Sequence, residues 1–220
     1  MLLLFFAFHL QFLVISSKDL DYSLECNLGY RVASFRRSPS VNNLIGTLTV
    51  ECEQLESNVQ CERLQSTPQC SGTIEGCSGN NWIGGFHAYT IENRTGAVLL
   101  EPICCSSSRI EIIDETCVRD RINVPYSKFT HSLAQDLIYR GMQCWHQYNT
   151  NNTLSDIIWK FEICSFRPPV LSPKYKGCRE CDCKCGIDNC PDYTHPIKII
   201  HKHYSSTSCG CECNCAFKCL

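Results

Sequence analysis

Hydrophobic and polar positions alternate in short runs along most of the chain, and one long apolar run stands at its beginning. Residues 1–17, MLLLFFAFHLQFLVISS, form that run. Its length and the polar residues that follow predict a secretory signal peptide that ends at Ser16 or Ser17. No later segment approaches the roughly 20 apolar residues that a membrane-spanning helix needs. We therefore expect a secreted, extracellular protein without a membrane span.

Three segments share one order of features and predict a repeated strand-turn-strand unit. They cover residues 26–52, 77–105 and 139–164. Each has a glycine near its start, a first strand with apolar positions, a polar turn and a second strand that ends on cysteine. An isolated hairpin is barely stable in water, so we expect the three units to share one core around an approximate threefold axis. The predicted fold class is all-β.

The connection between the second and third units has a different pattern. Phe129, Leu133 and Leu137 stand at helical spacing after Ser127, a residue that can cap a helix. The spacing predicts a short helix within residues 126–139, and an extended connection is the alternative.

A proline-rich stretch divides the chain. Residues 167–176 contain three prolines, which stiffen a segment and exclude it from helix and sheet interiors. We therefore expect a three-repeat β domain over residues 18–166, a linker over 167–176 and a small cysteine-rich tail over 177–220.

Cysteine adds the next constraint. The chain holds 20 Cys, a density typical of disulfide scaffolds in oxidising compartments. Ten lie in the domain and ten in the tail, and these even counts allow each part to be oxidised by itself. The disulfide candidates of the domain are Cys26, Cys52, Cys61, Cys70, Cys77, Cys104, Cys105, Cys117, Cys144 and Cys164.

Hairpin geometry suggests how some of these cysteines pair. Because the two ends of a hairpin lie side by side, we expect two bonds, Cys26–Cys52 and Cys144–Cys164. Neighbouring residues of a strand point to opposite faces, so Cys104 and Cys105 need different partners.

The tail contains possible metal ligands. Its alternating cysteines place several sulfurs on one face of an extended strand, and thiolates with imidazoles suit Zn²⁺ or Cu⁺. The candidates are His195, His201, His203, Cys181, Cys183 and Cys185. In an oxidising compartment such thiols usually form disulfides instead. We therefore expect the two cysteine clusters of the tail to join in a disulfide knot, without a cofactor.

Charge and motifs narrow the function. A formal net charge of −2 leaves no basic field that would attract nucleic acid. The sequence contains no nucleophile-elbow, zinc-helix, P-loop or dinucleotide-binding motif, so we expect no catalysis. Two sequons, at Asn93 and Asn151, predict glycans on exposed loops.

The ends of the units carry a family resemblance. The third unit closes with Asp156-Ile157-Ile158-Trp159 and runs on to Cys164, the second closes with Cys104-Cys105, and Cys61, Cys70 and Cys77 follow the first. In these features residues 26–166 resemble the dermatopontin family of extracellular matrix proteins and invertebrate lectins. That family has an Asp-Arg-x-Trp motif in the closing strand. Here Ile157 replaces the arginine, and Leu48 and Leu100 stand where the first two units would have tryptophan.

The resemblance implies a matrix-associated or lectin-like binding protein, with matrix components, proteoglycans or glycans as partners. Aromatic and polar side chains near turns suit such ligands, and the candidates are Tyr89, Trp145, His146 and Tyr148. A secreted toxin or defence protein is one alternative, because some members occur in venoms, and metal binding by the tail is another.

A second, weaker similarity concerns the fold alone. Residues 42–46, before the strand that ends at Cys52, resemble the vitelline membrane outer layer proteins, which have a β-prism of three sheets. This similarity suggests a β-prism-like arrangement of the three units.

Overall fold

The computed structural model describes residues 22–40, 43–90, 97–167, 182–186, 196–204 and 210–219. All regular elements within these ranges are β-strands, thirteen in number. The described residues therefore contain no helix that could cross a membrane. The all-β prediction is confirmed.

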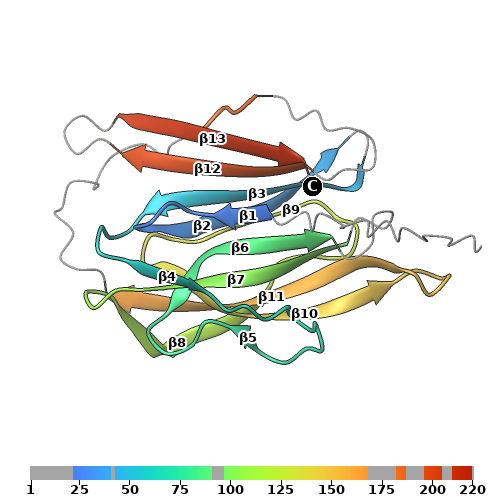
Figure 1. The fold of residues 1–220 in the computed structure, drawn as a ribbon, viewed down its shortest axis with the longest axis horizontal. Helices are drawn as coiled ribbons and strands as arrows, with labels where there is room; N and C mark the ends of the chain where they lie inside the picture. Colours follow the sequence, from blue (N-terminus) through green and yellow to red (C-terminus); the bar gives the residue numbers. More distant parts are fainter. Residues whose placement is uncertain are drawn as a thin grey trace, which may run out of the picture.

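The strands form three sheets (Figure 1). Sheet I, at the top of the view, has the order β13 (Cys211–Cys219), β12 (Pro196–Tyr204), β3 (Asn43–Gln54), β2 (Tyr30–Ser40) and β9 (Phe129–Ser132). Sheet II has the order β1 (Tyr22–Glu25), β6 (Trp82–Thr90), β7 (Val98–Ser106) and β4 (Gln60–Arg63). Sheet III, at the bottom, has the order β5 (Glu75–Gly76), β10 (Leu137–Tyr148), β11 (Leu154–Arg167) and β8 (Glu111–Arg121).

Each predicted unit forms the hairpin at the centre of a different sheet. The antiparallel pairs are β2 with β3, β6 with β7, and β10 with β11. The connection before the third unit contains no helix, because β9 pairs with β2 instead. Phe129, Leu133 and Leu137 are partly buried and pack against the core from this extended segment.

The flanking strands connect the units in a regular way. The strand before each hairpin in sequence and the strand after it both pair with the hairpin of another unit. The first unit thus supplies β1 and β4 to sheet II, the second supplies β5 and β8 to sheet III, and the third supplies β9 and β12 to sheet I. All these pairs are antiparallel except β12 with β3, which is parallel. The strand order is compatible with the threefold arrangement expected from the sequence.

The tail joins the body through this last strand. Residues Ile197 to Lys202 of β12 pair with Leu48 to Glu53 of β3, and β13 pairs with β12 along nine residues. The described tail strands are therefore part of sheet I, whereas the sequence suggested a separate tail. Apart from Arg167, the expected linker lies outside the described residues.

Side chains from all three hairpins meet in one core. The Phe35 ring of sheet I lies 5.7 Å from that of Phe86 in sheet II and 5.7 Å from that of Trp159 in sheet III, between ring centroids. Aromatic pairs in such tilted geometries add about 0.5–1.5 kcal/mol beyond their buried area. Leu48 and Leu100, the counterparts of Trp159 in the first two units, are each 1% exposed in the same cluster. The three anchors are thus alike in position although they differ in residue type.

A buried ion pair links sheet I to sheet III. The Arg37 guanidinium donates to Asp156 at 2.9 and 3.1 Å, and both side chains are 1% exposed. Arg37 also donates to the carbonyl oxygens of Ser127 and Val124, and Asp156 accepts the Tyr126 N–H at 2.8 Å. The buried guanidinium and the buried carboxylate thus both have hydrogen-bond partners besides each other, as a stable buried ion pair requires. Asp156, at the start of the closing strand motif of the third unit, therefore has a structural partner in another unit.

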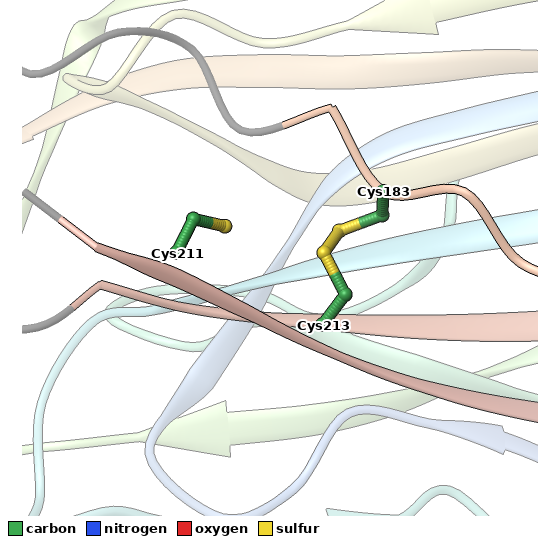
Figure 2. A group of neighbouring side chains, drawn as sticks. All are labelled: Cys183, Cys211 and Cys213. Carbon is green, nitrogen blue, oxygen red and sulfur yellow. A yellow bond between two sulfur atoms is a disulfide. The ribbon is translucent and has the colours of Figure 1, made fainter.

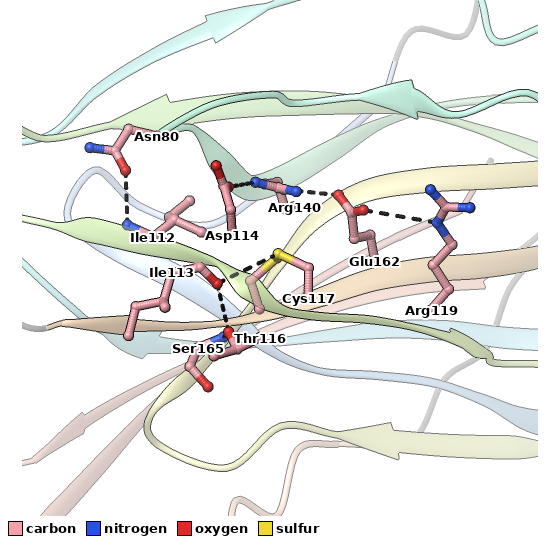
Figure 3. Close-up of a disulfide and its surroundings, with 11 residues drawn as sticks. Asn80, Ile112, Ile113, Asp114, Thr116, Cys117, Arg119, Arg140, Glu162 and Ser165 are labelled. Carbon is pink, nitrogen blue, oxygen red and sulfur yellow. Dashed lines mark hydrogen bonds and ion pairs between the residues drawn. A yellow bond between two sulfur atoms is a disulfide. The ribbon is translucent and has the colours of Figure 1, made fainter.

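Five disulfides bind the body together, and all ten candidate cysteines of the domain take part. The bonds are Cys26–Cys52, Cys61–Cys105, Cys70–Cys144, Cys77–Cys104 and Cys117–Cys164. The pairing predicted for the first unit is confirmed, and the doubled cysteines have different partners as expected. Figure 3 shows Cys117 on β8, near the ion pairs of Arg140 with Asp114 and Glu162.

The bond predicted for the third unit, between Cys144 and Cys164, is wrong. In the β10–β11 ladder Cys144 lies opposite Trp159 and Cys164 lies opposite Ile138, so the two cysteines stand at different ends of the hairpin. The prediction placed the start of the first strand near Cys144, but β10 begins at Leu137.

Candidate functional site

A groove of about 490 Å³ runs beside β4, at the edge of sheet II. Its size falls within the range of pockets that bind small ligands. Six of its eleven lining residues carry hydrogen-bonding side chains, namely Gln60, Glu62, Arg63, Ser78, Asn81 and Ser106. The groove therefore offers both donors and acceptors to a polar ligand.

Two disulfides fix the walls of this groove. The doubled cysteines at the end of β7 point to opposite faces, so that Cys105 bonds Cys61 of β4 and Cys104 bonds Cys77. The Cys105 sulfur packs against Gly84, where an added Cβ would collide with it. Since a sulfur in a disulfide cannot swing away, glycine is required here. The walls are thus held covalently before any ligand binds.

A charged cluster lies behind the groove. Arg63 Nε donates to the Glu101 carboxylate at 3.1 Å, and Arg63 also donates to the Tyr89 hydroxyl, which itself donates to Glu101. Glu101 is fully buried, while the Arg63 side chain is 36% exposed. Burial, followed by the hydrogen bond to Glu101, raises the pKa of Tyr89. The cluster holds Arg63 in a fixed orientation with part of its side chain exposed at the groove.

The four predicted ligand contacts lie on two sheets. Tyr89 is on β6 of sheet II, and its hydroxyl is engaged by Arg63 and Glu101. Trp145, His146 and Tyr148 are on β10 of sheet III.

The three candidates on β10 lie on opposite faces of the strand. His146 and Tyr148 are in edge-to-face contact, with ring centroids 6.1 Å apart. Trp145 points to the other face, as neighbouring residues of a strand do, and covers Gly72, where a side chain would collide with the indole. Trp145 and Tyr148 are both exposed. The structure therefore brings His146 and Tyr148 together and leaves Trp145 apart from them.

The sequon at Asn151 lies in the exposed turn between β10 and β11. The side-chain oxygen of Asn149 accepts the N–H groups of Asn151 and Thr153, and these bonds hold the turn while the Asn151 side chain stays exposed. This placement suits a glycan. Asn93 lies outside the described residues.

Disulfides occupy the described cysteines of the proposed metal site. Cys183 bonds Cys213, as Figure 2 shows, and Cys185 bonds Cys215. These two bonds fasten residues 182–186 to β13 and agree with the expected knot. Cys181 and His195 lie outside the described residues.

The histidines of β12 face away from these cysteines. In the β12–β13 ladder His201 lies opposite Asn214, whereas Cys213 lies opposite Lys202, so imidazoles and sulfurs are on opposite faces of the sheet. His201 Nε2 accepts the Asn27 N–H at 2.9 Å, and burial lowers the pKa of this ring. His201 and His203 thus lie on the face of the sheet opposite the cysteines of β13, and the metal site predicted from His195, His201, His203, Cys181, Cys183 and Cys185 stays a prediction.

Sequence reasoning missed the groove and the Arg63–Glu101 pair. Arg63 and Glu101 are 38 residues apart, on strands of different units, and neither belongs to a recognisable motif. The only sequence feature that pointed to this region was the doubled Cys104 and Cys105. Because neighbouring cysteines need different partners, two other segments had to lie close to the end of β7.

Comparisons with protein-family models, with curated proteins and with solved structures found no match. The resemblance to the dermatopontin family consequently stays a prediction.

Proposed function

We propose that the protein is a secreted, non-catalytic binding protein that holds a glycan in the groove beside β4. The observation that carries this proposal is a polar groove of about 490 Å³ whose walls are fixed by two disulfides. A preformed site loses little conformational entropy when it binds. Glycans of matrix proteoglycans and glycoproteins are the partners we expect.

The chemistry of the lining favours sugars with many hydroxyl groups. Asn81 and Gln60 each offer an amide donor and an amide acceptor, and Ser106 offers a hydroxyl that does both. Glu62 and Arg63 carry opposite charges, so the groove has no excess of positive charge that would select a polyanion. Neutral glycans match this set of donors and acceptors best.

Disulfide bonding supports the extracellular setting. No cysteine that the structure describes is free. Proteins with this many disulfides are typical of secretory compartments and the cell exterior.

A glycan array followed by calorimetry tests the proposal. We expect the oxidised protein to bind neutral glycans, and we expect Glu62→Ala and Asn81→Ala each to weaken binding about tenfold, or about 1.4 kcal/mol. The matched control is Glu115→Ala, which removes an exposed carboxylate from β8 in sheet III. An array without signal, or groove variants that bind like the control, would contradict the proposal.

A further inference from the structure

Three sulfurs converge at one end of β13. The Sγ atoms of Cys183, Cys211 and Cys213 all lie within 4.8 Å of one another. Figure 2 shows the Cys183–Cys213 disulfide with the Cys211 sulfur pointing toward it. Cys211 is itself disulfide-bonded. The oxidised protein therefore contains a third sulfur close to an existing disulfide.

The backbone alone places two of these sulfurs together. Cys211 and Cys213 are two residues apart on β13, so their side chains share one face. Antiparallel pairing with β12 runs from Cys211 opposite Tyr204 to Cys219 opposite Pro196 and fixes this strand. The ladder is held by backbone hydrogen bonds, which contain no sulfur, so we expect the shared face to persist when the disulfides open.

Burial distinguishes the Cys183–Cys213 bond from the disulfides of the body. Each body disulfide has at least one buried cysteine, whereas Cys183 is half-buried and Cys213 is exposed. Because thiol–disulfide exchange requires access to sulfur, a reductant opens the tail first. The tail is therefore the redox-sensitive part of the molecule.

An ion pair fastens β12 to β3 beside the cluster. Lys202 lies directly opposite Cys213 on the same face of the sheet, and it is 8% exposed. Its ammonium group pairs with the Glu51 carboxylate of β3 at 2.7 Å. This pair holds the strand against which β13 and its cysteines are aligned.

We propose that Cys183, Cys211 and Cys213 form a zinc site, and that this site becomes able to bind Zn²⁺ only after their disulfides have been reduced. A dithiol reductant transfers two electrons and two protons to the Cys183–Cys213 bond and closes into its own disulfide. A second dithiol opens the bond of Cys211 in the same way. The three thiols then release their protons and bind one Zn²⁺ as thiolates, and water takes the fourth position of the tetrahedron.

The geometry requires little movement. Zn–S bonds of about 2.3 Å at tetrahedral angles place sulfurs about 3.8 Å apart. The three sulfurs already lie within 4.8 Å, so small side-chain rotations suffice. The ion would then replace the Cys183–Cys213 disulfide as one of the links between residues 182–186 and β13.

Mild reduction followed by native mass spectrometry tests this site. The full mature protein is treated anaerobically with limiting reductant, desalted and mixed with Zn²⁺, and its remaining disulfides are mapped. We expect one zinc ion per chain after reduction and none before, with the five body disulfides intact. Zinc bound equally by the oxidised protein, or no zinc after the tail disulfides have opened, would overturn the proposal.

Paired substitutions identify the ligands without leaving an orphan thiol. Cys183→Ser with Cys213→Ser removes two of the three sulfurs and should abolish zinc binding. Cys185→Ser with Cys215→Ser removes the neighbouring disulfide and should leave zinc binding unchanged. Zinc bound by the first variant as by the second would contradict the assignment. Should a variant fail to fold, the comparison of oxidised and reduced wild-type protein still decides whether reduction creates a zinc site.

Discussion

At the residue scale, Asp156 shows what one buried charge does for the molecule. Its carboxylate holds Arg37 of another sheet and accepts the backbone N–H groups of Tyr126 and Ile157. The sequence identified Asp156 through its motif but not its partner, because Arg37 is 119 residues away. Arg63 of the groove and its buried partner Glu101 were missed for the same reason. Local pattern indicates which residues are buried, whereas long-range pairing decides which charges meet.

Asp156→Ala should destabilise the protein by about 3–5 kcal/mol, because it leaves the Arg37 guanidinium buried without a counterion. The matched control is Asp114→Ala, which removes a carboxylate that is 70% exposed and paired with Arg140 (Figure 3). Because Asp114 is exposed and Arg140 keeps its pair with Glu162, we expect this loss to be about 1 kcal/mol or less. Urea unfolding with the disulfides intact measures both variants. Equal losses in the two would show that the buried pair has no special role.

At the element scale, the three central hairpins followed from the sequence and their neighbours did not. Glycine, alternating apolar residues and a closing cysteine predicted each hairpin, and each lies at the centre of a sheet. The flanking strands come from other units, so no local pattern specifies their pairing. The spacing of Phe129, Leu133 and Leu137 allowed a helix, but pairing of β9 with β2 made the segment extended. In the tail, Ile197, Ile199 and Ile200 are buried, an apolar run that indicated a strand but stood beside the more conspicuous cysteines.

Attachment of β12 should weaken in acid. Burial lowers the pKa of His201 below that of an exposed imidazole, about 6.5. Above that pH the ring is neutral whether β12 is docked or open, so attachment is unaffected. As the pH falls below about 6.5 the open state takes up the proton first, and attachment weakens until the pH passes the folded pKa.

Hydrogen exchange of residues 197–202, corrected for the intrinsic pH dependence, measures this opening. We expect faster opening at pH 5 than at pH 7 in the wild-type protein. His201→Gln keeps an acceptor for the Asn27 N–H but does not titrate, so its opening should not change with pH. The same acid sensitivity in that variant would rule out His201 as the cause.

At the scale of the whole molecule, the tail is part of the body's structure. Ile197 and Ile199 of β12 belong to the same core cluster as Leu48 and Val50 of β3. The sequence predicted a boundary from its prolines and its change in composition. Composition differs between segments but does not indicate which segments pair. It therefore could not predict that β12 pairs in parallel with β3.

Ending the chain after Arg167 should therefore damage the body. Without β12, one edge of β3 loses its partner and apolar residues beneath it become exposed, which favours self-association. We expect a lower unfolding temperature and dimers or larger species in size-exclusion chromatography. A shortened chain that stays monomeric and unfolds at the same temperature would show that the tail is independent.

The pairing of β12 with β3 also matters during synthesis in the cell. The first hairpin to leave the ribosome is the last to obtain all its neighbours, because β12 follows the other two hairpins in the chain. At ordinary rates of translation this interval lasts on the order of 10 s. During that time the edge of β3 is open to chaperones and to other nascent chains. Cys26 and Cys52, which belong to this hairpin, can be oxidised early and hold it closed until the remaining strands arrive.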